Sequence, residues 1–215
     1  KDSTAKPSAG TSEYDVVFTP TDSNYKAVTG QVSVTVQKAA LKVKANDQTI
    51  TYGGSIQTGL DQVTASGLCN GDTLTDVTVS ASAKNAGTYQ NGITVTGAGI
   101  TRDGEDTAAN YVISYEAGKL IISPLTITVT PNSGQKKEYG ASDPVLTYTF
   151  SPSLIGSDQL SGSLAYAGEN VGTYEITMGT LAAPSENYTL TITPNVMFEI
   201  TKPSLENATV SLSAN

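Results

Sequence analysis

The sequence contains no histidine and no tryptophan, and it has a single cysteine, Cys69. Histidine is the commonest general base in enzymes and the commonest nitrogen ligand of transition metals, so its absence weighs against both kinds of site. A single cysteine excludes a disulfide within one chain and a zinc site built from several cysteines. We interpret Cys69 as a small residue near a turn, because no histidine is present to activate its thiol. We therefore expect no catalytic residue, no metal ligand, no cofactor and no enzymatic activity.

Charged residues are also scarce, and most of them are acidic. The 215 residues include 20 Asp and Glu against 12 Lys and Arg, a net charge of −8. Such a chain repels phosphate backbones and anionic lipid surfaces, so we expect no nucleic-acid partner. The longest apolar runs, such as Leu120-Ile121-Ile122, are far too short to span a bilayer, so we expect no membrane insertion by this stretch of chain.

Helical periodicity is missing as well. No stretch keeps apolar residues at i, i+3, i+4 and i+7 for three turns, whereas Thr and Val, which favour strands, are abundant. Strict alternation is clearest at Leu125, Ile127 and Val129, and it recurs at Val32, Val34 and Val36. These patterns predict an all-β chain with half-buried strands.

Short motifs occur twice along the chain, in the same order. They are Tyr52-Gly53 and Tyr139-Gly140, then Ala86-Gly87-Thr88-Tyr89 and Val171-Gly172-Thr173-Tyr174, then Asn110-Tyr111 and Asn187-Tyr188. Each copy closes on a β-rich run, Gly118 to Ile122 or Val196 to Ile200. Self-similarity with a period of roughly 80 residues predicts tandem modules.

This repetition divides the chain into four segments. Residues 39–124 and 125–202 are two complete β repeats, the second with about seven short strands, including one over Gly162 to Tyr166. Residues 1–38 correspond to the C-terminal part of a preceding repeat, and residues 203–215 to the start of a following repeat or a tail. The chain therefore looks like a fragment of a longer protein. The joints are short and two of them carry proline, which predicts a semi-rigid, extended array.

Three sets of polar residues are candidates for chemistry. Asp103, Glu105 and Asp106 form an acidic loop that could hold calcium, although their spacing is not that of an EF-hand. Asp143, Asp158, Glu169 and Glu175 could supply paired carboxylates for glycoside hydrolysis. Asp143 and Asp158 stand in Asp-Pro and Gly-x-Asp motifs, so we interpret them as turn caps. Lys42 and Lys119 could form isopeptide bonds with asparagine, but nothing in the sequence places the partners nearby.

Tyrosine is the only abundant aromatic residue, with 11 copies against 3 phenylalanines. Tyr89, Tyr111, Tyr174 and Tyr188 stand at repeated positions, so we interpret them as covering the core edge and hydrogen-bonding a neighbouring backbone. Tyr115, Tyr148 and Tyr166 could instead present exposed faces to a carbohydrate. Tyr166 has no counterpart in residues 39–124, so its role stays open.

The ordered motifs resemble the MBG domain repeat of the YGX type, which occurs in large bacterial cell-surface and secreted proteins. Residues 125–202 carry the pattern most fully, with Asp143-Pro144 and Leu146-Thr147-Tyr148 in addition to the motifs above. Residues 39–124 depart from it, because they lack Asp-Pro after Tyr-Gly and have a longer insertion, Thr96 to Ala109. Residues 1–38 are similar to the end of a bacterial immunoglobulin-like repeat, through Thr19-Pro20-Thr21-Asp22 and Asn24-Tyr25.

The resemblance implies tandem small β-sandwiches of immunoglobulin-like type, or β-grasp-like modules. It also implies an extracellular place on the bacterial cell surface, where the repeats act as a stalk or spacer and in adhesion. The partners would be neighbouring repeats and an unknown surface ligand, such as a host glycoprotein or glycan. The alternative is a carbohydrate-binding accessory module of a secreted glycan-active enzyme.

Overall fold

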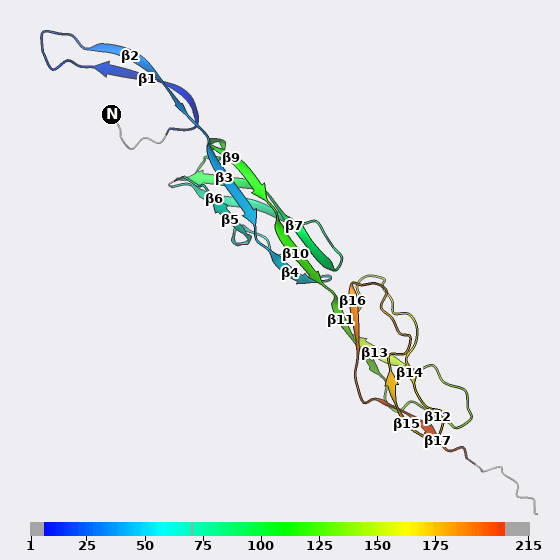
Figure 1. Cartoon of the computed structure of the whole chain (residues 1–215). Helices are drawn as coiled ribbons and strands as arrows, with labels where there is room; N and C mark the ends of the chain where they lie inside the picture. Colours follow the sequence, from blue (N-terminus) through cyan, green and yellow to red (C-terminus); the bar gives the residue numbers. More distant parts are fainter. Residues whose placement is uncertain (1–6, 70, 205–215) are drawn as a thin grey trace, which may run out of the picture. The chain divides into compact units, whose positions relative to one another are not determined.

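A computed structural model of the chain describes residues 7–69 and 71–204, shown in Figure 1. The chain forms two compact units: unit 1 is residues 1–50 and 54–122, and unit 2 is residues 51–53 and 123–215. The further repeat expected from residue 203 lies almost entirely outside the described residues. In the described parts of both units the only helical segments are two short 3-10 turns, η1 (Leu60–Gln62) and η2 (Ala108–Asn110), so the all-β prediction is confirmed.

In unit 1, residues 39–122 contribute to two sheets that share one core, and the hairpin of residues 10–36 described below is a third sheet. One sheet has the order β5-β3-β9, formed by Val63–Ser66, Ala39–Ala45 and Tyr111–Glu116. The other has the order β4-β10-β7-β6, formed by Gln48–Thr51, Gly118–Ser123, Gly87–Arg102 and Thr73–Ala81; β8 (Glu105–Asp106) pairs with the end of β7. In β3, Leu41, Val43 and Ala45 are buried while Lys42 and Lys44 face outward, as alternation in a strand requires.

Unit 2 repeats this arrangement. Its first sheet has the order β13-β11-β16, formed by Tyr148–Ser151, Leu125–Pro131 and Tyr188–Ile192. Its second has the order β12-β17-β15-β14, formed by Lys136–Glu138, Met197–Thr201, Gly172–Thr177 and Ala165–Tyr166. The strand expected over Gly162 to Tyr166 is shorter than predicted: only β14 is a strand, and Ser161 makes a single bridge to Ala182.

The strand registers show that the repeated motifs occupy equivalent places. The opening strand runs parallel to the Asn-Tyr strand, with Ala39 opposite Tyr111 and Leu125 opposite Tyr188. The Gly-Thr-Tyr strand runs antiparallel to the closing strand in both units: Gly87 lies opposite Ile122, and Gly172 opposite Ile200. Each Tyr-Gly corner also binds the end of a closing strand, Tyr52 N–H to Ser123 O at 2.8 Å and Tyr139 N–H to Thr201 O at 2.9 Å.

The core of each unit lies between its two sheets. In unit 2 the buried side chains of the core come from both sheets and the loops between them: Val129, Leu146, Leu164, Ile176, Leu181, Phe198 and Ile200. Two sheets packed face to face make a β-sandwich. A β-grasp-like module would pack a helix on one sheet, and no helix of that kind occurs in residues 7–69 or 71–204. The sandwich alternative therefore describes both units.

The opening strand β3 and the Asn-Tyr strand β9 continue into β4 and β10 of the second sheet. Two neighbouring segments of the chain therefore cross from one sheet to the other. Gly118 marks this crossing in unit 1. A Cβ atom there would come within 2.6 Å of Asn46 O and 2.7 Å of Ala45 O, so a side chain does not fit. Glycine is required at this point because the two backbones approach so closely.

Residues 10–36 form an antiparallel hairpin of β1 (Gly10–Phe18) and β2 (Val28–Val36). Its register, with Gly10 opposite Val36, is that of the Gly-Thr-Tyr strand and the closing strand in the complete units. The alternating valines of β2 predicted a half-buried strand. This prediction is wrong for two of them, because Val32 and Val34 are exposed. Alternation indicates which side chains share a face, but burial also requires a second sheet against that face, and within the described residues the hairpin forms a sheet of two strands.

Candidate functional site

The main buried polar cluster of unit 1 is built around Asp72. Asp72 directly precedes β6, Arg102 ends β7 and Tyr111 begins β9, so three strand ends bring the side chains together. The Asp72 side chain is only 1% exposed, and Arg102 binds it with two bonds, Nε to Oδ1 at 2.7 Å and Nη2 to Oδ2 at 2.8 Å. The Tyr111 hydroxyl donates to Oδ2, and Thr107 Oγ1 donates to Oδ1 at 3.2 Å. Every oxygen of the carboxylate therefore has a partner.

This arrangement keeps Asp72 charged and Tyr111 neutral. Burial by itself disfavours the carboxylate, but the bonds from Arg102, Tyr111 and Thr107 outweigh it and lower the pKa of Asp72 below its usual range. Burial, and then the bond to Asp72, raise the pKa of the Tyr111 phenol. A carboxylate with a lowered pKa and a phenol with a raised one are both poor proton-transfer groups near neutral pH. The cluster is suited to holding strands together.

Unit 2 contains the same Asp–Tyr pair. Tyr188 Oη donates to Asp158 Oδ2 at 2.7 Å and accepts the Ile155 N–H at 2.9 Å; Tyr111 Oη accepts the Cys69 N–H at the same distance. In both units the aspartate closes a turn that begins three residues earlier, with N–H to O distances of 3.0 Å for Asp72 and 3.3 Å for Asp158. The glycine- and aspartate-containing turns, Gly71-Asp72 and Gly156-Ser157-Asp158, and the Asn-Tyr motifs are thus the two halves of one interaction.

The interpretation of Asp158 as a turn cap is right about the turn and wrong about the role of its carboxylate. Asp72 and Asp158 lie in turns, but their carboxylates bind a tyrosine that is 39 or 30 residues further along the chain. Cys69, predicted to lie near a turn, does begin the first of these turns, and its thiol is exposed. The sequence signal was available, since the two motifs recur together in both repeats, but motif order does not reveal which motifs touch.

The Gly-Thr-Tyr tyrosines behave as predicted. Tyr89 Oη donates to Asn85 O at 3.1 Å, and Tyr174 Oη donates to Asn170 O at 2.8 Å, four residues upstream in each case. This bond fixes the loop that leads into the strand. It resembles the tyrosine corner of β-sandwiches, in which a tyrosine hydroxyl binds the backbone a few residues upstream.

Two glutamines were missed. Gln48 and Gln135 each stand four residues before the Tyr-Gly tyrosine, and each amide bridges the loop that follows it. Gln48 accepts the Gln57 N–H at 2.7 Å and donates to Gln57 O at 2.9 Å. Gln135 accepts the Thr147 N–H at 2.6 Å and donates to Thr147 O at 3.1 Å. The signal was the spacing Gln-x-x-x-Tyr-Gly, which is identical in the two repeats.

Tyr166 is not an exposed platform for a sugar. Its ring stacks on Phe198 with centroids 4.0 Å apart, so one face is covered. Its hydroxyl donates to Asp143, whose carboxylate also binds Lys137 Nζ at 2.5 Å. The Lys137 and Tyr166 bonds lower the pKa of Asp143, so this aspartate holds side chains in place and the turn-cap interpretation is wrong here too. Tyr148 is half-buried against the core, and Tyr115 is exposed, with its hydroxyl accepting the Ala98 N–H at 3.0 Å.

The acidic candidates do not gather into a site. Within residues 7–69 and 71–204, no three His, Cys, Asp or Glu side chains form a group that could hold a metal ion, and this includes the loop of Asp103, Glu105 and Asp106. Asp106 accepts the Ala108 N–H at 2.9 Å. Of the acids considered for glycoside hydrolysis, Asp143 and Asp158 bind tyrosines, and Glu175 accepts the Asn195 N–H at 2.8 Å.

The lysines considered for isopeptide bonds form ion pairs with acids. Lys42 and Lys44 both bind Glu116 on the neighbouring strand, the second pair at 2.8 Å. Lys119 Nζ lies 3.9 Å from Asp47, which also accepts the Lys119 N–H at 2.8 Å.

Glu116 should titrate at unusually low pH. Hydrogen bonds from Lys42 and Lys44 lower its pKa to about 2. Its contribution to stability should be present above its ordinary pKa and disappear as the pH falls toward 2, but it should be small because the group is exposed. Carboxyl NMR titration of the full chain checks this value. A Glu116 pKa near 4 in the wild type, unchanged by Lys44→Ala, would contradict the assignment.

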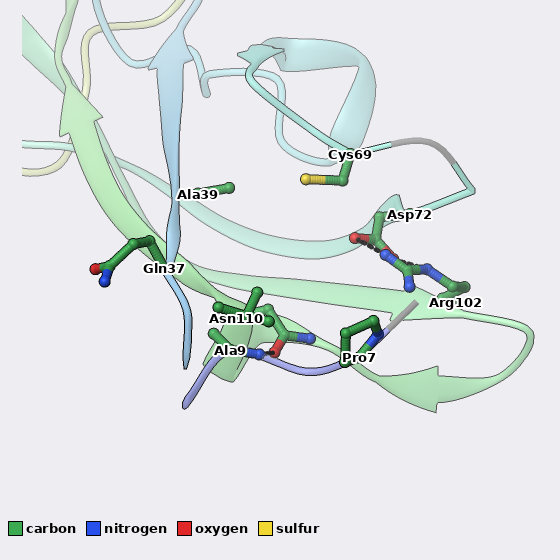
Figure 2. A pocket seen from close by; sticks show the side chains of 9 residues that line it. Pro7, Ala9, Gln37, Ala39, Cys69, Asp72, Arg102 and Asn110 are labelled. Atoms are coloured by element: carbon green, nitrogen blue, oxygen red, sulfur yellow. Dashed lines mark hydrogen bonds and ion pairs between the residues drawn. The ribbon is translucent and has the colours of Figure 1, made fainter. Parts of the chain in front are cut away.

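One cavity of about 90 Å³ lies beside the Asp72 cluster (Figure 2). It is lined by Pro7, Ala9, Val36, Gln37, Ala39, Cys69, Asp72, Arg102 and Asn110. The Ala9 N–H donates to Asn110 Oδ1 at 2.7 Å, which fastens the residues before β1 to this side of the cavity. The lining contains no nucleophile with an adjacent base, because the acid is already bound by Arg102 and Tyr111.

Comparisons with known proteins agree with the repeated architecture. A family model described as MBG domain (YGX type) matches residues 41–121 and again residues 127–198. No curated protein and no solved structure matches the chain. Among the described residues, none of the helical segments has the length and apolar character needed to cross a membrane.

Proposed function

We propose, because the chain belongs to the MBG domain (YGX type) family, that it is a non-enzymatic repeat region that acts as a stalk or spacer outside a bacterial cell. Repeats of this kind are typical of surface proteins. In this role each unit contributes length, and the folded sandwich resists collapse. Adhesion to a host glycoprotein or glycan would be a further property of exposed surfaces.

The observation that carries the proposal is the use made of the repeated polar residues. Asp72 and Asp158 bind tyrosines, Tyr89 and Tyr174 bind backbone carbonyls, and the cores around them are apolar. The polar side chains that recur in both units therefore stabilise the strands and the loops between them. The carbohydrate-binding alternative loses the support that Tyr166 would have given it, because that ring stacks on Phe198.

The spacer role predicts an elongated particle in solution. A single compact globule of this length would have a radius of gyration of about 17 Å. Small-angle scattering of the chain at several concentrations should give a clearly larger value, with a maximum dimension that does not depend on concentration. A radius near 17 Å would contradict the spacer role, whatever the fold of each unit.

A further inference from the structure

The Tyr52-Gly53 corner shows what the end of a repeat can bind. In unit 2, to which this corner belongs, the Tyr52 ring meets the Tyr188 ring edge-on, with centroids 5.3 Å apart. The Tyr52 N–H donates to Ser123 O at 2.8 Å. Gly53 lies against Ile155, and a Cβ atom on Gly53 would come within 2.2 Å of Ile155 Cδ1. The Tyr-Gly corner therefore contacts three parts of the fold. They are the tyrosine of an Asp–Tyr pair, the residue that begins the turn closed by the aspartate of that pair, and a backbone carbonyl.

Unit 1 has the same three parts at its cavity, with Tyr111 buried behind the lining, where its hydroxyl binds the lining residues Asp72 and Cys69. Tyr111 corresponds to Tyr188, since both belong to the Asp–Tyr pair, and Cys69 corresponds to Ile155, since both begin the turn and donate their N–H to that tyrosine. The matching registers place Val36 where Ile122 stands, so Gln37 corresponds to Ser123. Gln37 and Cys69 both line the cavity.

The strand beside this cavity is also able to accept a partner. In unit 2, β12 runs parallel to the closing strand β17 on the side away from β15, and Tyr139-Gly140 directly follows its last residue. The equivalent closing strand in the hairpin is β2, which within the described residues pairs with β1 alone. An extended segment added to a sheet edge gains backbone hydrogen bonds along its whole length.

We propose that the cavity of unit 1 binds a Tyr-Gly corner supplied by another repeat unit. The bound segment lies parallel to β2 and ends in Tyr-Gly, with the ring in the cavity on the side of Tyr111, the glycine against Cys69 and the tyrosine N–H on the Gln37 carbonyl. The chain itself presents such a corner: Tyr139 is 51% exposed, and no atom lies within 4 Å of a Cβ built on Gly140. This inference goes beyond the spacer role, because it concerns a binding site that works whatever the array is for.

The lone thiol provides a direct test on the full chain. The probe is a synthetic peptide with the sequence of residues 46–55, which contains Tyr52-Gly53. At a peptide concentration of about 1 mM, a range suited to weak complexes, the reaction of Cys69 with an aromatic disulfide reagent should slow by at least about threefold. Amide NMR signals of Gln37, Cys69 and Tyr111 should shift, while those of Tyr188 should not.

Matched peptides and one chain variant serve as controls. Peptides carrying Tyr52→Ala or Gly53→Val should neither protect the thiol nor move the signals, because one lacks the ring and the other the space for close approach. Cys69→Arg places a long side chain in the site at an exposed position, so it should abolish the shifts without unfolding the unit. Absence of protection and of shifts with the wild-type peptide overturns the proposal, as does equal protection by the Tyr52→Ala peptide.

Discussion

Asp72→Ala should destabilise unit 1 by about 3–5 kcal/mol, because it leaves the Arg102 charge and the buried Tyr111 hydroxyl without their common partner. That is a large part of the stability of a domain of this size. Urea unfolding followed by NMR reads the two units separately, through Ile93 in unit 1 and Ile176 in unit 2. The signals of unit 1 should shift to lower urea, and those of unit 2 should keep their midpoint.

Two matched variants distinguish the loss of the Asp72–Arg102 ion pair from the general effect of removing a carboxylate. Asp76→Ala, at an exposed position of β6, should change the stability of unit 1 by about 0.5 kcal/mol or less. Asp158→Ala should cost unit 2 about 1–3 kcal/mol, since its partner is a neutral tyrosine. If Asp72→Ala costs no more than Asp158→Ala, the arginine pair adds nothing, and our account of this cluster is wrong.

The same cluster makes the stability of unit 1 depend on pH in the acid range. The pKa of Asp72 is lowered in the folded chain, so its contribution is fully present above the ordinary aspartate pKa of about 4 and is lost as the pH falls through the lowered value. The urea midpoint of the wild type should therefore fall more steeply below about pH 4 than that of Asp72→Asn.

Phe198→Ala should destabilise unit 2 by about 3–5 kcal/mol. Phe198 is fully buried among Ile176 and Ile200, and its ring stacks on Tyr166, so truncation leaves a cavity and removes the support of that tyrosine. The same NMR-detected urea unfolding checks the result, with the signals of unit 1 as internal reference. The control is Phe150→Ala on β13, where the side chain is 40% exposed, and the cost should be much smaller. Equal costs at the two positions would show that Phe198 is not in the core.

Much of the fold was predictable from local pattern. Alternation located the opening strands, and motif order showed that the two repeats are equivalent, because side-chain period and turn chemistry are properties of a few neighbouring residues. The parallel pairing of Leu125 with Tyr188 was not predictable in this way. It joins strands more than 60 residues apart, and no local signal states which strands meet.

The candidate site was less predictable than the fold. The tyrosines were correctly interpreted as structural, but Asp158, the partner of Tyr188, was assigned a turn-cap role, and Asp72, the partner of Tyr111, was not identified. Arg102 was missed because it lies in the insertion that unit 2 lacks, so repetition gave no hint of it. The role of Tyr166 was left open because residues 39–124 contain no counterpart of it, and only its stacking on Phe198 decides its role. Contacts across strand ends depend on the folded topology, which motif spacing does not contain.

One measurement addresses the repeated architecture directly. Nuclear Overhauser contacts in the labelled chain should connect Tyr111 with Cys69 and Tyr188 with Ile155, and should connect the opening strand with the Asn-Tyr strand in both units, at Ala39–Tyr111 and at Leu125–Tyr188. Both sets of contacts are expected together. Finding one set without the other, or contacts that join Tyr111 and Tyr188 to unlike strands, would show that the two copies do not share one fold.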